Sequence, residues 1–396
     1  MISEKMLALG KKSSAIREIF EYGKKRKAEI GEENVFDFSL GNPSVCPPAI
    51  VNETIKELVS SADPIALHGY TSAPGDMETR KAIASYLANK YGTDDTAENI
   101  YMTVGAAASL TISLGAIVCE GDEVIALAPY FPEYRVFAEN AGAKLCEVKC
   151  RAGDFQIDVE ELRVAVSEHT KAIIINSPNN PTGVVFSEES IKALADLLSS
   201  KEKEYGHPIY IISDEPYREL VYGNINVPYT ANYYNNTISC YSFSKSLSLP
   251  GERIGYICVS KKCDEWKELF FAVCGAGRAL GFVCAPSLMQ KVIPYCIGKT
   301  SDTSVYDRNR TLLYEELSKY GYECVSPDGA FYMFVKAFCD DAAEFCEAAK
   351  KHELLLVPSD SFGVGGYVRI SYCVTTEQIE RALPAFYALA KEYGKI

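Results

Sequence analysis

In the first part of the chain, the apolar residues recur with the period of a helix. Amphipathic helix patterns, separated by turn-forming residues, run through the opening part of the chain and enclose one short strand. The predicted elements are helices over 13–30, 49–61 and 76–91 and a strand over 35–40. Two turn-rich segments, 41–48 and 68–75, separate them. This part of the chain is therefore expected to contribute mainly helices.

The period changes at about residue 99, where short apolar strands begin to alternate with helices. This alternation is typical of a mainly parallel sheet that helices cover on both faces. The predicted strands span 100–104, 123–128, 144–149, 172–176, 209–213, 237–241 and 253–259. The predicted helices between them span 106–118, 132–141, 159–166 and 188–200. We therefore expect an α/β fold with a mainly parallel, seven-stranded sheet.

The chain changes character again after residue 259. The pattern is first helical, and strands and helices then alternate once more. The predicted helices span 287–297, 301–320, 342–351 and 376–392, and the predicted strands span 331–335, 354–357 and 367–372. We expect two domains, a large one over 48–297 and a smaller α+β domain formed by 1–47 together with 298–396.

The composition is ordinary for a globular protein, with 396 residues of which 47% are hydrophobic and 23% charged. The net charge of −13 argues against nucleic acid or an anionic membrane as a partner, because surfaces that follow phosphates need clustered basic residues. No apolar run approaches the ~20 residues that span a bilayer, and residues 1–6 lack the apolar core of a signal peptide. We therefore expect a cytoplasmic protein.

Fourteen cysteines and four histidines raise the question of a metal site or of disulfides. The cysteines are scattered, no Cys-x-x-Cys pair occurs, and the histidines lie far apart in the sequence. We therefore predict no metal site, and reduced cysteines that pack in the interior, as Cys119, Cys240 and Cys373 would within their apolar runs.

The first candidate for chemistry is Lys245. It lies among serines directly after the predicted strand 237–241, and Arg253 follows eight positions later. A desolvated lysine beside another cation has a lowered pKa and can form a Schiff base, while serine hydroxyls and an arginine suit a phosphate. Together these residues suggest pyridoxal phosphate. A solvated lysine in an ordinary serine-rich turn is the alternative.

The ends of two earlier strands carry weaker signals. Gly105, Ala106 and Ala107 open a helix with small residues, so that backbone N–H groups can approach an anion, although small residues also open purely structural helices. Phe131 follows the strand 123–128 and could stack on a planar ring, although packing in the core is the common role of such a residue.

The ends of two later strands carry stronger signals. Asn180 lies in a turn over 177–183 that prolines and a glycine make rigid, so its amide can be a positioned donor. Asp214 closes an apolar strand, and a buried carboxylate needs a partner, for which a cationic ring nitrogen is suited. Tyr217 could reach an oxygen on the same ring. An aspartate that caps a local turn is the alternative for Asp214.

Taken in order, these motifs resemble those of the class I/II, fold type I pyridoxal-phosphate-dependent aminotransferases. The resemblance runs from about Phe36 to the C-terminus and rests on several motifs that occur together. They are Gly41-Asn42-Pro43, Tyr70 with Pro74-Gly75, Ser177 to Gly183, Asp214 to Tyr217, Ser242-x-Ser244-Lys245, Gly251-x-Arg253-x-Gly255-Tyr256, and Arg369.

The resemblance implies a transaminase that exchanges an amino group between an L-amino acid and a 2-oxo acid in two half-reactions. Lys245 would hold the cofactor as a Schiff base and then move the proton at the substrate Cα. Asp214 would keep the pyridine nitrogen protonated, Tyr217 and Asn180 would bind the ring oxygen O3′, and Phe131 would stack on the ring.

The resemblance also implies how the two ends of the bound molecules are held. The residues expected at the phosphate are Gly105, Ala106, Ala107, Ser242, Ser244 and Arg253. Tyr70 of the partner subunit would complete this site, so that a homodimer with shared active sites is expected. Arg369 would grip the substrate α-carboxylate as a bidentate pair, helped by the backbone of Gly41 and by Asn180.

Three alternatives stay open at this point. The same scaffold could carry a C–S β-elimination or a decarboxylation, or it could be a non-catalytic aminotransferase-like protein. A regulator would need a DNA-binding module, for which the ~35 residues before Phe36 are too short. Arg278 could neutralise a second substrate carboxylate, although a salt-bridged interface residue is the preferred interpretation.

Overall fold

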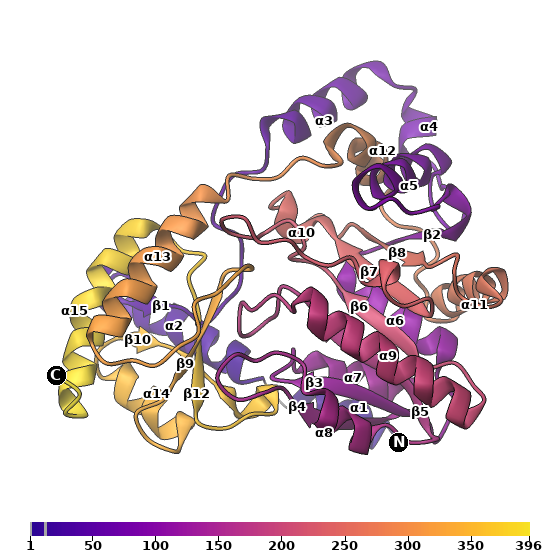
Figure 1. The fold of residues 1–396 in the computed structure, drawn as a ribbon. Helices are drawn as coiled ribbons and strands as arrows, with labels where there is room; N and C mark the ends of the chain where they lie inside the picture. The colour runs from indigo at the N-terminus through magenta and orange to yellow at the C-terminus, as the bar shows by residue number, and fades with distance from the viewer. Residues whose placement is uncertain (1, 12–13) are drawn as a thin grey trace.

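The computed structural model describes residues 2–11 and 14–396, and a seven-stranded sheet lies at its centre (Figure 1). The strand order is β2-β8-β7-β6-β5-β3-β4. The strands are β2 (Ile100–Thr103), β3 (Glu123–Ala128), β4 (Lys144–Lys149), β5 (Thr170–Asn176), β6 (Tyr210–Asp214), β7 (Thr237–Ser242) and β8 (Gly255–Val259). This confirms the predicted α/β class and the seven strands.

The sheet is mixed at one edge. The strands from β4 through β3, β5 and β6 to β7 are parallel, whereas β8 runs antiparallel to both β7 and β2. The central strands are nearly continuous runs of isoleucine, valine and alanine, as expected for strands that are buried on both faces. The carboxyl ends of β3, β5, β6 and β7 therefore meet at one edge of the sheet.

Helices cover both faces of this sheet. Each layer has its own apolar cluster, and alternate residues of β3 belong to the two clusters. The first layer contains α6 (Ala106–Ile117), α7 (Glu133–Ala141) and α11 (Trp266–Ala279). The second contains α8 (Val159–Ala165) and α9 (Glu188–Tyr205).

A group of helices packs beside the β2 edge, at the top of Figure 1. It consists of α3 (Ala49–Ser61), α4 (Pro64–His68), α5 (Met77–Tyr91) and α12 (Ser287–Cys296). The short α10 (Phe243–Ser246) follows β7 directly and packs on the same apolar cluster.

Two small sheets and the remaining helices bring the two ends of the chain together. One sheet has the order β11-β12-β9 and the other pairs β1 with β10. These strands are β1 (Phe36–Asp37), β9 (Tyr332–Lys336), β10 (Leu354–Leu355), β11 (Val357–Pro358) and β12 (Tyr367–Ser371). The helices are α2 (Ala15–Ile30), α13 (Ser304–Lys319), α14 (Ala342–Lys350) and α15 (Thr376–Glu392). The first helix, α1 (Glu4–Lys11), lies apart from them beside the large sheet (Figure 1), where Lys5 Nζ donates to the carbonyl oxygen of Glu139 in α7. The smaller α+β unit that the sequence predicts at the end of the chain is thus present.

Some elements differ from the prediction. The predicted strand 35–40 is reduced to β1, the strand 354–357 is divided into β10 and β11, and position 13 of the predicted helix 13–30 lies outside the described residues. The helix α11 was not predicted, because its glycines resemble a loop. A glycine is needed at position 277 of this helix for packing, since a Cβ there would lie 2.2 Å from the Tyr101 hydroxyl.

The cysteines partly follow the prediction. All fourteen are free, and several are buried. The prediction of interior packing was wrong for Cys46 and Cys119, which are exposed. Cys119 lies in the loop directly after α6, where the backbone has already turned toward solvent. Among the described residues, no helix is both long and apolar enough to cross a membrane.

Candidate active site

A cavity of about 280 Å³ lies at the carboxyl edge of the large sheet. It is lined by all the site residues predicted from the sequence except Gly105 and Tyr70. The loops after β3, β5, β6 and β7 reach it, as does Arg369 from β12. Strand ends in an open α/β sheet are where ligands usually bind, so this cavity is the candidate active site.

Lys245 reaches into the cavity from α10. Its Nζ donates a hydrogen bond to the carbonyl oxygen of Gly41 at 2.7 Å and lies 5.3 Å from the centre of the Phe331 ring. Burial, together with the positive charges of Arg369 and Arg253, lowers the pKa of Lys245 to about 8. About a tenth of this amine is therefore neutral at pH 7, far more than for an ordinary lysine with a pKa near 10.5, and this form can act as a nucleophile or a base.

Asp214 closes β6 and is buried. Its Oδ2 accepts a hydrogen bond from the Tyr134 hydroxyl at 2.5 Å, whereas Oδ1 has no hydrogen-bond partner among the described residues. Burial raises the pKa of Asp214 to about 7. A buried carboxylate oxygen without a partner is costly, so the position is suited to a cationic N–H donor.

Asn176 and Asn180 connect Asp214 to Arg369 by a chain of hydrogen bonds. Asn176 closes β5 in register with Asp214, and its Nδ2 donates to the Asp214 carbonyl at 2.8 Å. Its Oδ1 accepts from the backbone N–H of Asn180 at 2.7 Å. Asn180 in turn accepts a hydrogen bond from Nη1 of Arg369 through its Oδ1, at 3.0 Å. The polar turn after β5 is therefore fixed at both ends.

Arg369 lies in the middle of β12 and only 2% of it is exposed. Besides the bond to Asn180, its Nη2 donates to the carbonyl oxygen of Ser39 at 2.5 Å. Its Nε has no partner in the part of the chain that the structure describes. Burial lowers the pKa of Arg369. A buried guanidinium with an unused donor is suited to binding a carboxylate.

Arg253 lines the opposite end of the cavity, and Gly105 lies next to its guanidinium. Arg253 adopts a positive φ of 52°, and its Nη1 donates to the Pro250 carbonyl at 2.9 Å and to Ser244 Oγ at 3.5 Å. Gly105 has a φ of 100°, and a Cβ there would lie 2.8 Å from Nη2 of Arg253. The start of α6 follows at Ala106. Backbone N–H groups, serine hydroxyls and a guanidinium thus converge as an anion site would require.

Three aromatic residues shape the remaining wall. Phe131 lines the cavity and packs edge-on against Tyr134, with ring centres 5.8 Å apart. The hydroxyls of Tyr217 and Tyr332 lie 3.1 Å apart. Tyr134 and Tyr332 were not predicted from the sequence. Tyr134 lies three residues after Phe131, at the start of α7, and that spacing was the one signal that could have suggested it.

Two predicted residues lie elsewhere. Tyr70 is 99% exposed in the loop after α4, and Arg278 is exposed near the end of α11. The structure does not bring either of them into the cavity of its own subunit. Their predicted roles require a second copy of the chain.

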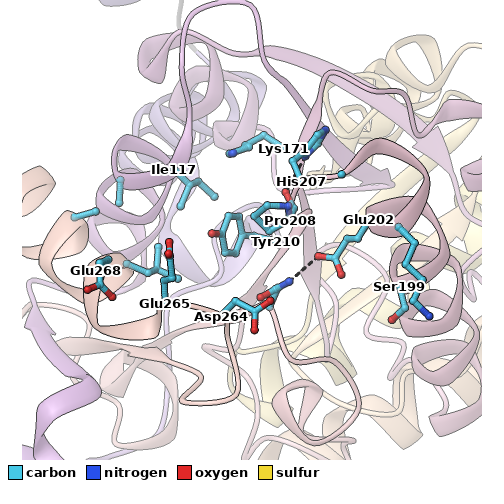
Figure 2. A pocket seen from close by; sticks show the side chains of 16 residues that line it. Ile117, Lys171, Ser199, Glu202, His207, Pro208, Tyr210, Asp264, Glu265 and Glu268 are labelled. Atoms are coloured by element: carbon cyan, nitrogen blue, oxygen red, sulfur yellow. Dashed lines mark hydrogen bonds between the residues drawn. The ribbon is translucent and has the colours of Figure 1, made fainter.

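A larger cavity, of about 810 Å³, lies at the other edge of the sheet (Figure 2). It is bounded by α9, by the start of α11 and by the amino ends of β5 and β6, with side chains such as Lys171, Glu202, His207 and Glu265. None of the predicted site residues lines it. Size alone therefore does not identify the active site in this fold.

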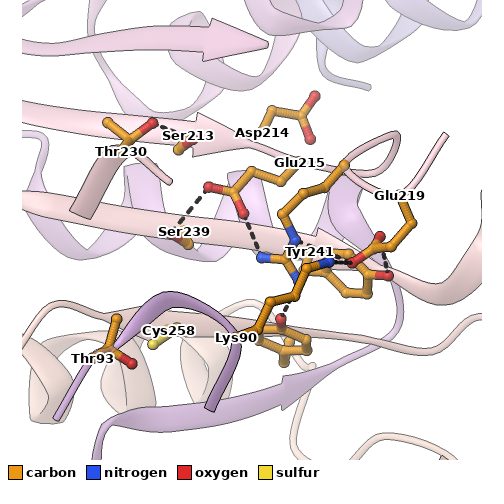
Figure 3. A network of polar contacts seen from close by, with 12 residues as sticks. Lys90, Thr93, Ser213, Asp214, Glu215, Glu219, Thr230, Ser239, Tyr241 and Cys258 are labelled. Atoms are coloured by element: carbon orange, nitrogen blue, oxygen red, sulfur yellow. Dashed lines mark hydrogen bonds and ion pairs between the residues drawn. The ribbon is translucent and has the colours of Figure 1, made fainter. Parts of the chain in front are cut away.

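A buried network of charges supports the loop that follows Asp214 (Figure 3). Arg218 forms ion pairs with Glu215 Oε2 at 2.7 Å and with Glu219 Oε1 at 3.2 Å. The Tyr241 hydroxyl donates to Glu219 Oε2 at 2.7 Å and lies 2.9 Å from the hydroxyl of Ser246, next to Lys245. The loop after β6 is thereby attached to the helix that carries the lysine.

A family model described as aminotransferase class I and II matches residues 33–386, which is most of the chain. The chain belongs to this family. The aminotransferase fold and activity predicted from the sequence are thus confirmed.

Individual relatives agree with this assignment. This aminotransferase is 30% identical over 392 residues to aromatic-amino-acid aminotransferase 2 of Thermococcus litoralis, with 96% of both chains covered. It is 58% identical to an aminotransferase of Eubacterium rectale whose crystal structure has a TM-score of 0.98, with 99% of each chain covered. The aspartate aminotransferase of Thermus thermophilus, solved with maleate, is 26% identical with a TM-score of 0.86, covering 98% of this chain and 100% of that one.

Proposed function

We propose that this aminotransferase binds pyridoxal 5′-phosphate in the cavity and exchanges an amino group between an L-amino acid and a 2-oxo acid. The observation that carries the proposal is the unpaired Oδ1 of Asp214, which is buried in a cavity that also holds a lysine with a lowered pKa. Together they supply an anion for a ring nitrogen and an amine for an aldehyde.

The other residues of the cavity fit the same cofactor. Asp214 would pair with the ring nitrogen, and Tyr217 and Asn180 would bind the ring oxygen. The ring would stack on Phe131. The phosphate would lie in the anion site formed by Gly105, Ala106, Ala107, Ser242, Ser244 and Arg253. When bound, pyridoxal phosphate supplies an electron sink that stabilises negative charge at the substrate Cα.

The chain's own side chains would then do three things. Arg369 would bind the α-carboxylate through its free Nε edge and orient the amino acid in the cavity. Lys245, whose amine is held by the Gly41 carbonyl, would take the proton from Cα and return it. Asp214 would remain ionised, because a cationic partner offsets the effect of burial on its carboxylate.

A homodimer with shared active sites belongs to this proposal. Tyr70 is almost fully exposed in a single chain, which is unusual for a large aromatic residue and suits a contact with a second copy. Tyr70 of the partner subunit would then reach the phosphate. We further propose the division into a large domain over 48–297 and a small domain over 1–47 and 298–396, with the cavity between them.

The proposal is tested on the purified protein loaded with pyridoxal 5′-phosphate. We expect a Schiff-base absorbance band that amino acids discharge and 2-oxo acids restore. Lys245→Ala should abolish both, whereas Lys192→Ala, at an exposed position of α9, should preserve both. Release of pyruvate and thiol from cysteine conjugates, without any amino acceptor, would instead identify a β-eliminating lyase. A protein that holds no cofactor would contradict the proposal altogether.

A further inference from the structure

We propose that Tyr332 is a positioning residue that connects the cofactor half of the site to its carboxylate half. The inference rests on the proposed function, because it assigns a task to a residue within the same cavity. Tyr332 opens β9 and is buried, and its side chain faces the cavity. Three independent contacts define its position.

The first contact is with Tyr217. The two hydroxyl oxygens lie 3.1 Å apart, and the rings pack edge to face with centres 5.8 Å apart. A tyrosine hydroxyl has one proton to donate. When Tyr217 gives its proton to the ring oxygen of the cofactor, the hydrogen bond between the tyrosines is possible only if Tyr332 is the donor. A donor at Tyr332 then polarises the Tyr217 hydroxyl and strengthens its hydrogen bond to the ring oxygen.

The second contact is with Arg369. The guanidinium carbon lies 4.6 Å from the centre of the Tyr332 ring. The ring therefore supports one face of the guanidinium, while Asn180 and the Ser39 carbonyl hold its two Nη atoms. This arrangement leaves the Nε edge as the part of Arg369 that is available for a carboxylate.

The third contact is with Gly41. A Cβ at this position would lie 1.9 Å from the Tyr332 hydroxyl, so the glycine provides the space that the hydroxyl occupies. The carbonyl of the same glycine accepts the hydrogen bond from Lys245. Tyr332 is thus in contact with the residue that holds the lysine, with the residue that binds the ring oxygen and with the residue that binds the carboxylate.

The hydroxyl and the ring of Tyr332 therefore have different roles. The hydroxyl acts on Tyr217, and the ring acts on Arg369. Removing the hydroxyl alone weakens the stabilisation of a negative ring oxygen, so the Schiff base retains its proton to a higher pH. Removing the ring as well loosens the guanidinium and weakens substrate binding. The charged or titratable groups facing the two hydroxyls are Arg369, Asp214 and Cys373, and Lys245 lines the same cavity.

The test compares three variants of the loaded enzyme. Tyr332→Phe should raise the pH midpoint of the cofactor absorbance by about half a unit and leave KM for the amino acid within about twofold. Tyr332→Leu should show the same shift and also raise KM about tenfold. Tyr234→Phe removes another buried hydroxyl, which donates to the Ile209 carbonyl at 2.7 Å, and should leave the midpoint unchanged.

Each outcome decides the inference. An unshifted midpoint in Tyr332→Phe, with a normal absorbance in the wild type, overturns it and leaves the proposed function intact. A shift of equal size in Tyr234→Phe also overturns it, because any lost hydroxyl would then suffice. If Tyr332→Phe does not fold, Gly41→Ala displaces the hydroxyl while keeping the tyrosine, and the same upward shift is expected. If the wild-type protein binds no cofactor, both this inference and the proposed function are contradicted.

Discussion

Asn176 and Asp214 close neighbouring parallel strands in register, and the Nδ2 of Asn176 donates to the carbonyl oxygen of Asp214 at 2.8 Å. This bond fixes the backbone from which the carboxylate projects. Tyr134 then holds Oδ2, so that Oδ1 alone is left for a ligand. The position of the unpaired oxygen is therefore determined by two neighbouring side chains, Asn176 and Tyr134.

The first prediction concerns the charge of Asp214. Asp214→Asn keeps the size of the side chain but removes the anion, so the ring nitrogen of the cofactor would lose the group that keeps it protonated. We expect kcat to fall about 100- to 1000-fold in steady-state transamination. Asp196→Asn, at an exposed position of α9, is the matched control and should retain full activity. Activity within tenfold of the wild type would contradict the role of Asp214.

The second prediction concerns the pH dependence of cofactor loading. An amine attacks an aldehyde only in its neutral form, and the pKa of Lys245 is lowered from 10.5 to about 8. The rate at which depleted protein takes up pyridoxal phosphate should therefore rise with pH, level off above about 8, and fall about tenfold for each unit below it. Absorbance measurements from about pH 6 to pH 10 check this. A rate that still rises tenfold between pH 9 and 10 would indicate an ordinary solvated lysine.

Sequence reasoning found those site residues whose polarity is unexpected for their position. Asp214 and Lys245 follow apolar strands, where a charged group has few structural uses. Asn176 carried the same signal, as a polar residue at the end of an apolar strand, and it could have been found in the same way. Tyr332 could not, and Tyr134 carried only its spacing from Phe131 as a signal, because aromatic residues on a helix or a strand are normally core residues. Only the packing of distant elements gives them a polar neighbour.

The fold could be predicted for a similar reason, and the errors of that prediction are confined to individual elements. The alternation of apolar strands and helices specified the large sheet to within one or two residues at most of its strand ends. The sequence could not reveal that α11 is a helix, because the glycines at 275 and 277 weaken the helical signal. Position 277 requires a glycine because Tyr101, which lies on a different element, leaves no room for a side chain.

The third prediction concerns Arg369. Arg369→Lys keeps a positive charge but cannot hold Asn180, the Ser39 carbonyl and a carboxylate at once, because an ammonium lacks the planar fork. We expect kcat/KM for amino acids to fall about 10- to 100-fold, mainly through KM. Arg310→Lys, which affects an ion pair with Asp307 on α13, is the control. Unchanged KM values would place the substrate carboxylate elsewhere.

The fourth prediction concerns stability. Arg218→Met leaves the buried carboxylates of Glu215 and Glu219 without their main cation. We expect the free energy of unfolding to fall by about 3–5 kcal/mol in denaturant titrations of the loaded protein. Lys192→Met breaks an exposed pair with Glu188 and should leave the free energy of unfolding nearly unchanged. A similarly small loss for Arg218→Met would show that the network is not a structural support.

The pairing of β1 with β10 has a consequence for the way the protein is made. Phe36 and Asp37 leave the ribosome about 300 residues before their partners Leu354 and Leu355 are synthesised. The strands of the large sheet all lie between Ile100 and Val259, so that sheet can assemble first. Arg369 arrives last of all the site residues. A chain cut short before β12 would therefore retain the residues proposed to surround the cofactor but would lack the guanidinium proposed to bind the substrate carboxylate.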